Sequence, residues 1–276
     1  MLSLSLSLSL SLWPTMSEAG AVEVGDKYRS HMYGEEEKDT EWRHGGPPNY
    51  DIVNKLFEEG RTKAWPKGSL EEVVQNAIKS WEMELSHKTR IKDFKTINPE
   101  KFNFIVNGIL ALACYLSVHI RREGLSAEET LRLGSYNALL QSSMPEEYRR
   151  WYKAEEESFE SSHEVFRKAF PRGFAWEVVE LYSGPPVIVF KYRHWGYMEG
   201  PFRGKAPTGE MVQFTGIAVL KVDEKLRAED VEIYYDPSEL FAGLLKGPLV
   251  SIDDHQVQVQ VRGSSSSSCP FSKGSE

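Results

Sequence analysis

Apolar residues recur at helical spacing in several parts of the N-terminal half of the chain. The clearest case begins at Ser69, whose side chain can cap a helix, with Glu72 placed to complete a capping box. An apolar stripe with a period near 3.6 residues follows and predicts an amphipathic helix. The stripe consists of Leu70, Val73, Val74, Ala77, Ile78, Trp81 and Leu85.

Three further segments carry helix signals. Asp51–Glu59 is a short candidate, and Ser126–Leu140 begins with a second capping box. Glu155–Phe170 gathers its aromatic residues on one face and ends before Pro171, which cannot continue a helix. The N-terminal half is therefore predicted to be mainly helical.

The pattern changes after residue 173 to an alternation with a period of two, rich in β-branched and aromatic residues. Turn residues separate the segments, and Lys101–Gly108 is an additional polar strand candidate. Helices first and hairpin-connected strands after predict an α+β fold, in which a curved antiparallel sheet packs on the N-terminal helices. The four main predicted strands are Phe174–Tyr182, Val187–Trp195, Met211–Val222 and Val231–Tyr235.

Strand alternation also shows which side chains share the inner face of the sheet. The sets without cations are the inner ones, and they contain two small residues in mid-strand, Gly216 and Ala218. Small residues there indicate either a bend or free space above them. Free space predicts an apolar pocket, whose composition is typical of a small-molecule site, whereas the alternative is that helices fill the space. The predicted pocket residues are Tyr192, Phe190, Phe214, Gly216 and Tyr235.

Three titratable residues are candidates for chemistry at this pocket. His194 shares the inner face and is a candidate acid/base group, although a core histidine bonded to backbone fits the same pattern. His163 lies on the apolar face of its predicted helix and is a further ligand contact. Asp236 follows the last strand near the pocket mouth, where it is a candidate catalytic partner of His194. It also caps a short predicted helix that runs to Lys246.

Composition narrows the classes of partner. There are 33 Lys and Arg against 41 Asp and Glu, so the net charge of −8 disfavours nucleic acid and anionic membranes. Two cysteines and the absence of an Asn-x-Ser/Thr site favour a reducing, cytoplasmic compartment. The histidines have no metal-ligand spacing, and the Gly200–Gly209 segment precedes a strand instead of a helix. No metal and no cofactor is predicted.

Three segments stand apart from the predicted domain at 27–250. Residues 1–26 begin with an unbroken Leu-Ser alternation, which a translated dinucleotide repeat would encode, and form a predicted low-complexity leader. Residues 251–276 form a predicted disordered tail. Ile109–Ile120 is an apolar run too short to span a bilayer as a helix, so it is either buried structure or an insertion.

Several longer motifs resemble the plant pathogen-related protein family, and the resemblance covers most of residues 27–250. They are EWRHG at 41–45, the block 69–88, EESFESSHEVFRKAFP at 156–171, FKYRHWGYMEG at 190–200 and PTG at 207–209. More distantly, the arrangement of strand, PTG, strand and Asp resembles SnoaL-like domains of the nuclear transport factor 2-like superfamily. That resemblance implies a cone-shaped sheet wrapped around helices, with a pocket inside.

The resemblance also has implications for function. Pathogen-related proteins are linked to plant defence, and SnoaL-like cyclases use an aspartate near the end of the last strand, which Asp236 matches best. The chain departs from the family pattern at Ile109–Arg121, which looks like a gene-model or splicing variant. We expect a protein that binds a small apolar ligand. The alternatives are an acid/base enzyme of the cyclase, isomerase or hydratase type, and a homodimeric interaction module without ligand.

Overall fold

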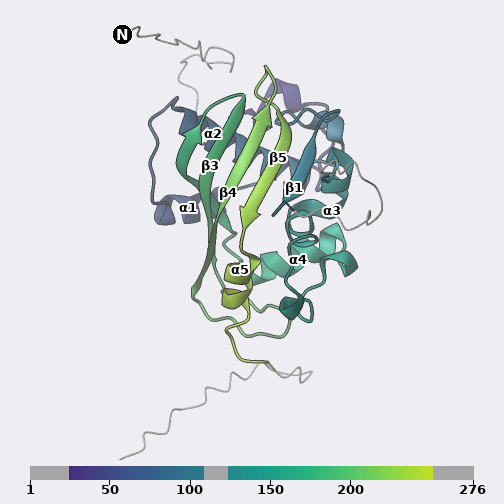
Figure 1. The fold of residues 1–276 in the computed structure, drawn as a ribbon, viewed down its shortest axis with the longest axis vertical. Helices are drawn as coiled ribbons and strands as arrows, with labels where there is room; N and C mark the ends of the chain where they lie inside the picture. The colour runs from purple at the N-terminus through teal and green to yellow at the C-terminus, as the bar shows by residue number, and fades with distance from the viewer. Residues whose placement is uncertain (1–24, 109–123, 251–276) are drawn as a thin grey trace, which may run out of the picture.

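The computed structural model describes residues 25–108 and 124–250, and a five-stranded curved sheet forms its centre (Figure 1). The strand order is β1-β5-β4-β3-β2. The last four strands are antiparallel neighbours, and β1 pairs with β5 in parallel. The strands are β1 (Asn103–Val106), β2 (Ala175–Ser183), β3 (Val187–Tyr197), β4 (Met211–Val222) and β5 (Ala228–Tyr235).

The α+β prediction is confirmed, with one correction to the sheet. The predicted strand at 101–108 forms β1, but it runs parallel to β5 at the edge, so the sheet is mixed and not wholly antiparallel. Register shifts in the β2–β3 and β4–β5 ladders mark irregular points where strands bend. These bends help the sheet to curve around the helices.

Three helices begin at the capping residues that the sequence predicts, which are Ser69, Ser126 and Asp236. Ser69 Oγ accepts from Glu72 N at 3.3 Å, and Ser126 forms a complete capping box with Glu129. The predicted helix at 155–170 is divided, because Ser158 caps a helix that starts only at residue 159 and a 3₁₀ turn precedes it. The helices are α1 (Asp51–Gly60), α2 (Leu70–His87), α3 (Ala127–Leu140), α4 (Phe159–Ala169) and α5 (Pro237–Leu244).

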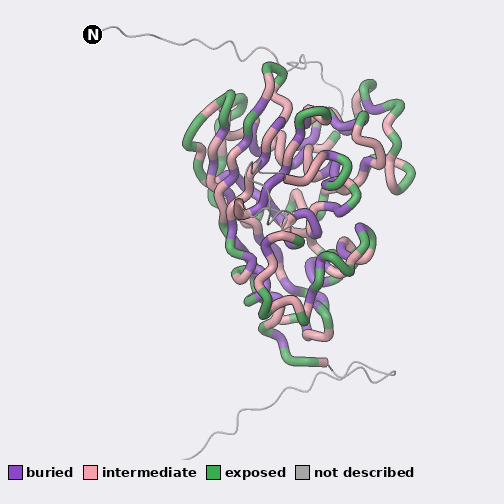
Figure 2. Tube along the Cα trace, turned by 45° about the vertical axis from the view of Figure 1, so that its right-hand side comes forward, coloured by how far each residue is buried: buried purple, intermediate pink, exposed green. Residues whose placement is uncertain are grey.

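In the view of Figure 1, α2 passes behind the strands, α3 and α4 lie on the side of β1, and α5 follows the end of β5. Buried residues concentrate between these layers, while the loop tips are exposed (Figure 2). The predicted inner face is confirmed at Ile188, Phe190 and Tyr192, whose exposed fractions are 5%, 0% and 3%. The main core is therefore the space between the inner face of the sheet and these helices.

The opposite face of the sheet is not left bare, which corrects the prediction of helices on one face. Trp195 belongs to the outer set but is fully buried, because Leu56 and Phe57 of α1 pack against it. Lys79 of α2 reaches the same cluster, with its ammonium 3.4 Å from the centre of the Phe57 ring. The predicted leader up to residue 24, the predicted insertion at 109–121 and the predicted tail at 251–276 lie outside the described residues.

Candidate functional site

Three cavities lie between the inner face of the sheet and the helices. We name them by position. The hairpin cavity lies between α2 and the sheet end that carries the β2–β3 and β4–β5 turns, and the α5 cavity lies near Leu240. The central cavity lies between them and has a volume of about 80 Å³. Its apolar wall includes Trp81, Phe104, Trp176, Phe190, Phe214 and Ala218.

The wall of the central cavity also carries three polar groups without partners. In the described part of the chain, the Glu82 carboxylate and the Tyr192 hydroxyl form no hydrogen bond or ion pair. His194 Nδ1 is buried and likewise has no partner there. A fourth group, Ser135, points toward His163, with Oγ and Nε2 3.5 Å apart. The cavity therefore combines an apolar surface with unused hydrogen-bonding capacity.

Burial sets the charge of these groups. It lowers the pKa of His194 to about 3, an effect that Lys79 strengthens and the Ala175 carbonyl partly opposes. His194 is therefore a neutral imidazole near pH 7. Burial also raises the pKa of Glu82, although Arg29 and Lys79 act in the opposite direction. The pKa of the Tyr192 phenol is raised by burial too, so the phenol stays protonated.

These groups constrain what the cavity can contain. A buried polar group without a hydrogen bond costs about 1–3 kcal/mol, and native proteins leave few such groups. His194 Nδ1 is such a buried atom, and the Glu82 carboxylate and the Tyr192 hydroxyl lie on the same wall without partners in the ranges that the structure describes. A molecule that supplies the missing partners explains this arrangement most simply. Water can do so in part, but an apolar wall favours a ligand that is mostly apolar.

The structure brings five of the predicted site residues to these cavities. Phe190, Tyr192, His194 and Phe214 line the central cavity, while Tyr235 lines the α5 cavity together with His194 and Phe214. The Tyr235 hydroxyl is already used, because it lies 3.1 Å from Ser143 Oγ and donates to the Leu139 carbonyl at 3.3 Å.

Gly216 affects the shape of the central cavity because it has no Cβ atom. A Cβ atom at this position would lie 2.4 Å from the Tyr192 hydroxyl oxygen and 2.5 Å from the Tyr234 carbonyl oxygen. Real Cβ atoms do not approach that closely, so Gly216 provides the room that the Tyr192 phenol occupies. The predicted small residue in mid-strand thus makes space for a polar group of the wall.

His163 is separated from the central cavity by a wall residue, Ser135. Its Nδ1 is 2.7 Å from the Phe159 carbonyl oxygen, and its ring stacks on Phe159. It lines none of the three cavities and reaches the central one only through Ser135. In this structure His163 is a neighbour of a wall residue, and direct ligand contact by His163 stays a prediction.

Asp236 is not brought together with His194. Its side chain is exposed and caps α5, accepting a hydrogen bond from Ser238 N at 2.8 Å. It lines none of the three cavities, two of which contain His194. The structural role predicted for Asp236 is confirmed, whereas its pairing with His194 finds no geometric support.

Glu82 is a polar wall residue that the sequence interpretation missed. It lies four residues after Ile78 and three before Leu85, so it shares the helix face that carries the apolar stripe. A carboxylate inside such a stripe is the signal that could have identified it. Ser135 and Tyr136 of α3, which line the α5 cavity, were missed because the weaker periodicity of that helix did not indicate its inner face.

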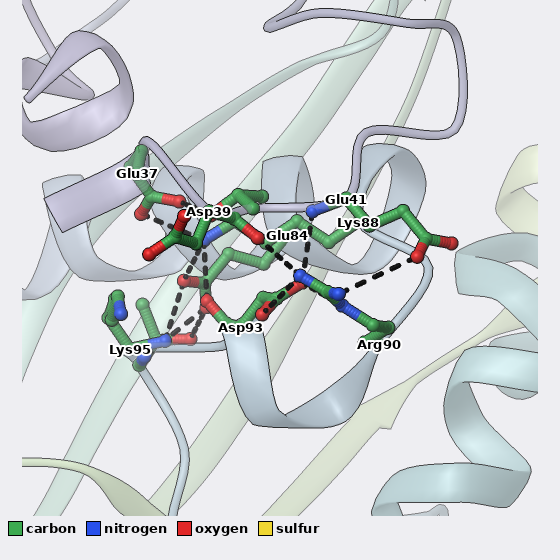
Figure 3. A network of polar contacts seen from close by, with 10 residues as sticks. Glu37, Asp39, Glu41, Glu84, Lys88, Arg90, Asp93 and Lys95 are labelled. Atoms are coloured by element: carbon green, nitrogen blue, oxygen red, sulfur yellow. Dashed lines mark hydrogen bonds and ion pairs between the residues drawn. The ribbon is translucent and has the colours of Figure 1, made fainter.

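A second polar cluster lies at the end of α2, where Lys88 is fully buried (Figure 3). His31, Glu37 and Glu84 offer ligand atoms within 4.8 Å of one another, as a metal site requires. However, Lys88 Nζ already donates to Glu37 Oε1 at 2.9 Å and to Glu84 Oε1 at 3.1 Å. The ammonium supplies the positive charge that a metal would bring, so these residues fit a structural ion pair better than a metal site.

The fold and the cavity define the chain as an α+β protein with an apolar internal cavity that carries unpaired polar groups. No protein-family model matches the chain. It is 45% identical over 260 residues to the pathogen-related protein of Hordeum vulgare, an alignment that covers 94% of this chain and all of that protein. The chain therefore belongs to the pathogen-related protein family.

Solved structures with a similar fold include polyketide cyclase relatives. One is IdmH from Streptomyces antibioticus, assigned as a polyketide cyclase, with 12% identity, coverage of 61% of this chain and 96% of that one, and a TM-score of 0.34. Another, from Jannaschia, is assigned as a SnoaL-like polyketide cyclase, with 17% identity, coverage of 55% and 76%, and a TM-score of 0.30. No helix in the described ranges is long and apolar enough to cross a bilayer.

Proposed function

We propose that this protein binds a small, mostly apolar molecule in its central cavity, as part of a defence-linked role. The observation that supports the proposal is the set of unpaired polar groups, Glu82, Tyr192 and His194, on an otherwise apolar wall. A ligand would complete their hydrogen bonds and cover the aromatic surface. Homodimer formation through the outer face of the sheet and a cytoplasmic location belong to the same proposal as predictions.

Native mass spectrometry of protein purified from plant tissue tests this proposal. The expected result is a chain that carries one additional small mass, which organic extraction releases. Since side chains of α2, α3 and the sheet form most of the cavity wall, we expect the complex to survive gentle ionisation. A chain mass that equals the polypeptide alone, in preparations that remain folded, would contradict the binding function.

A second candidate function is acid/base catalysis, now with Glu82 in place of Asp236 as the partner of His194. The observation in its favour is that Glu82 and His194 line the same cavity, which Asp236 does not. A carboxylate with a raised pKa is a stronger base, and the free Nδ1 of a neutral His194 can accept a hydrogen bond that orients the ligand. Glu82 would remove a proton from a carbon of the ligand and return one to it.

Solvent exchange tests this second function and does not require that the ligand be identified first. The retained molecule, incubated with the protein in heavy water, should gain deuterium at the reacting carbon. Glu82→Gln and His194→Gln should each slow this exchange by roughly a hundredfold or more. Asp236→Asn is the matched control, because asparagine caps helices as well as aspartate does. Exchange at wild-type rate in Glu82→Gln would refute the catalytic assignment.

A further inference from the structure

The hairpin cavity adjoins the central cavity on the side of the β2–β3 and β4–β5 turns, and its wall has a different composition. The two share the wall residues Ile78, Trp81 and Val231. The wall of the hairpin cavity is built mainly from aliphatic side chains of α2 and the strands. Its one hydroxyl group, on Thr96, is occupied because Thr96 Oγ1 donates to Glu84 Oε2 at 2.5 Å. This cavity therefore offers mainly dispersion and apolar burial, and the indole N–H of Trp81, which it shares with the central cavity, is the one side-chain donor on its wall without a partner among the described residues.

The internal space thus has a polarity gradient along one direction. Unpaired polar groups lie in the central cavity, and the hairpin cavity next to it is aliphatic. A molecule that matches both parts has a polar end and an apolar tail. The tail must be an unbranched chain, because the two cavities are separated by a shared wall that includes Ile78 and Trp81. The side chains of these two residues would have to move to let the tail pass.

The wall also restricts the charge of the polar end. The residues that line the hairpin, central and α5 cavities include no lysine and no arginine, and Glu82 is their one acidic member. An anionic end would lose its hydration without gaining a positive partner, which is strongly unfavourable. Tyr192, neutral His194 and Glu82 can instead donate to or accept from a hydroxyl or carbonyl oxygen.

We propose that the ligand is a single-chain amphiphile with a neutral hydroxyl or carbonyl head at Glu82, Tyr192 and His194, and an aliphatic tail in the hairpin cavity. The inference rests on the proposed binding function and adds the class and orientation of the ligand. It assigns the aliphatic residues of α2, which lie away from the unpaired polar groups, to tail recognition. Ala77 is the clearest of these, because it lines the hairpin cavity and not the central one.

Calorimetric titration with n-hexanol, n-octanol and n-decanol tests the tail. Each added methylene that becomes buried contributes about 0.8 kcal/mol, or about four-fold in Kd. From n-hexanol to n-decanol we expect tightening on the order of a hundred-fold. Ala77→Phe fills the hairpin cavity and should remove most of this gain with chain length. Ala242→Phe places the same change at an exposed position of α5 and should keep the gain.

The head is tested with the same chain length and different end groups. At pH 8, n-decanoate should bind more weakly than n-decanol, because its carboxylate finds no positive partner on the wall. Tyr192→Phe should weaken all alcohols by a similar factor of about five, because it removes one hydrogen bond wherever the tail ends. Tyr192→Phe thus raises the Kd of every alcohol by the same factor, whereas Ala77→Phe reduces the gain in affinity with chain length.

Three results would overturn the inference. They are an affinity that does not rise beyond n-hexanol, an equal gain with length in Ala77→Phe, and n-decanoate that binds as tightly as n-decanol. If no alcohol binds while native mass spectrometry detects a retained molecule, the ligand class is wrong and the binding function stands. If neither is observed, both proposals fail.

Discussion

Removing the ammonium of Lys88 should be the most damaging single change in the polar network at the end of α2. Lys88 Nζ donates to Glu37, to Glu84 and to the Asp93 carbonyl, the last at 2.7 Å (Figure 3). The side chains of Lys88 and Glu84 are 0% exposed and that of Glu37 is 3% exposed. Lys88→Met would leave two carboxylates buried without their cation.

The expected loss of stability is large. Removal of one partner of a buried ion pair costs about 3–5 kcal/mol, against a total stability of about 5–15 kcal/mol for a typical protein. The network also positions the start of the hairpin cavity, since Glu84 accepts hydrogen bonds from Lys95 N at 2.7 Å and from Thr96 N at 3.2 Å. Lys88→Met should therefore weaken ligand binding as well as folding.

Urea unfolding followed by tryptophan fluorescence measures this loss. Lys88→Met should lower the midpoint by about 1 M or more, given slopes of about 1–3 kcal/mol/M. Lys92→Met, at an exposed lysine four residues on, is the control and should change the midpoint little. Glu84→Gln should destabilise the wild type but recover part of the loss in Lys88→Met, because it removes one unpaired charge. Simple additivity of the two substitutions would refute this account of the network.

Three other predictions concern the cavity and its surroundings. Because burial lowers the pKa of His194 from 6.5 to about 3, only the unfolded state gains this proton as the pH falls from 6.5 toward 3. Stability should decline by about 1.4 kcal/mol per pH unit more in the wild type than in His194→Gln, as thermal unfolding at several pH values will show. Burial likewise lowers the pKa of Lys79 from 10.5 to about 7, so only the unfolded state keeps this proton between these pH values. The free energy of unfolding should therefore rise from pH 7 to 10 in the wild type, and rise less in Lys79→Met. Equal dependence on pH in the two proteins would contradict the lowered pKa of Lys79. Gly216→Ala should cost about 1–3 kcal/mol in urea unfolding and weaken ligand binding, because the new methyl group clashes with the Tyr192 phenol and the Tyr234 carbonyl; an unchanged midpoint would exclude that clash.

Local signals in the sequence were sufficient for much of the fold. The Ser126 cap is read directly from side-chain chemistry, and the bounds of β4 follow from strict alternation. The alternation also identified the face that carries Tyr192 and His194, because a period of two admits only two assignments. These features depend on residues that are neighbours along the chain.

Features that depend on distant contacts were not predictable in the same way. The parallel pairing of β1 with β5 joins residues more than a hundred positions apart, and nothing local encodes it. The burial of Trp195 under α1 is similar, since its alternation alone places it on the outer face. Asp236 combines both kinds of feature: its role as the cap of α5 follows from the local sequence and is confirmed, whereas its position relative to His194 depends on distant contacts, and its side chain lines none of the three cavities.

The most direct test of the central claim is a crystal structure of protein purified from plant tissue with its ligand retained. The account predicts continuous density for one elongated molecule in the central cavity, within hydrogen-bond distance of at least two of Glu82, Tyr192 and His194, and extending past Ile78. Separate water molecules that satisfy these three groups, or side chains that close the cavity, would contradict it.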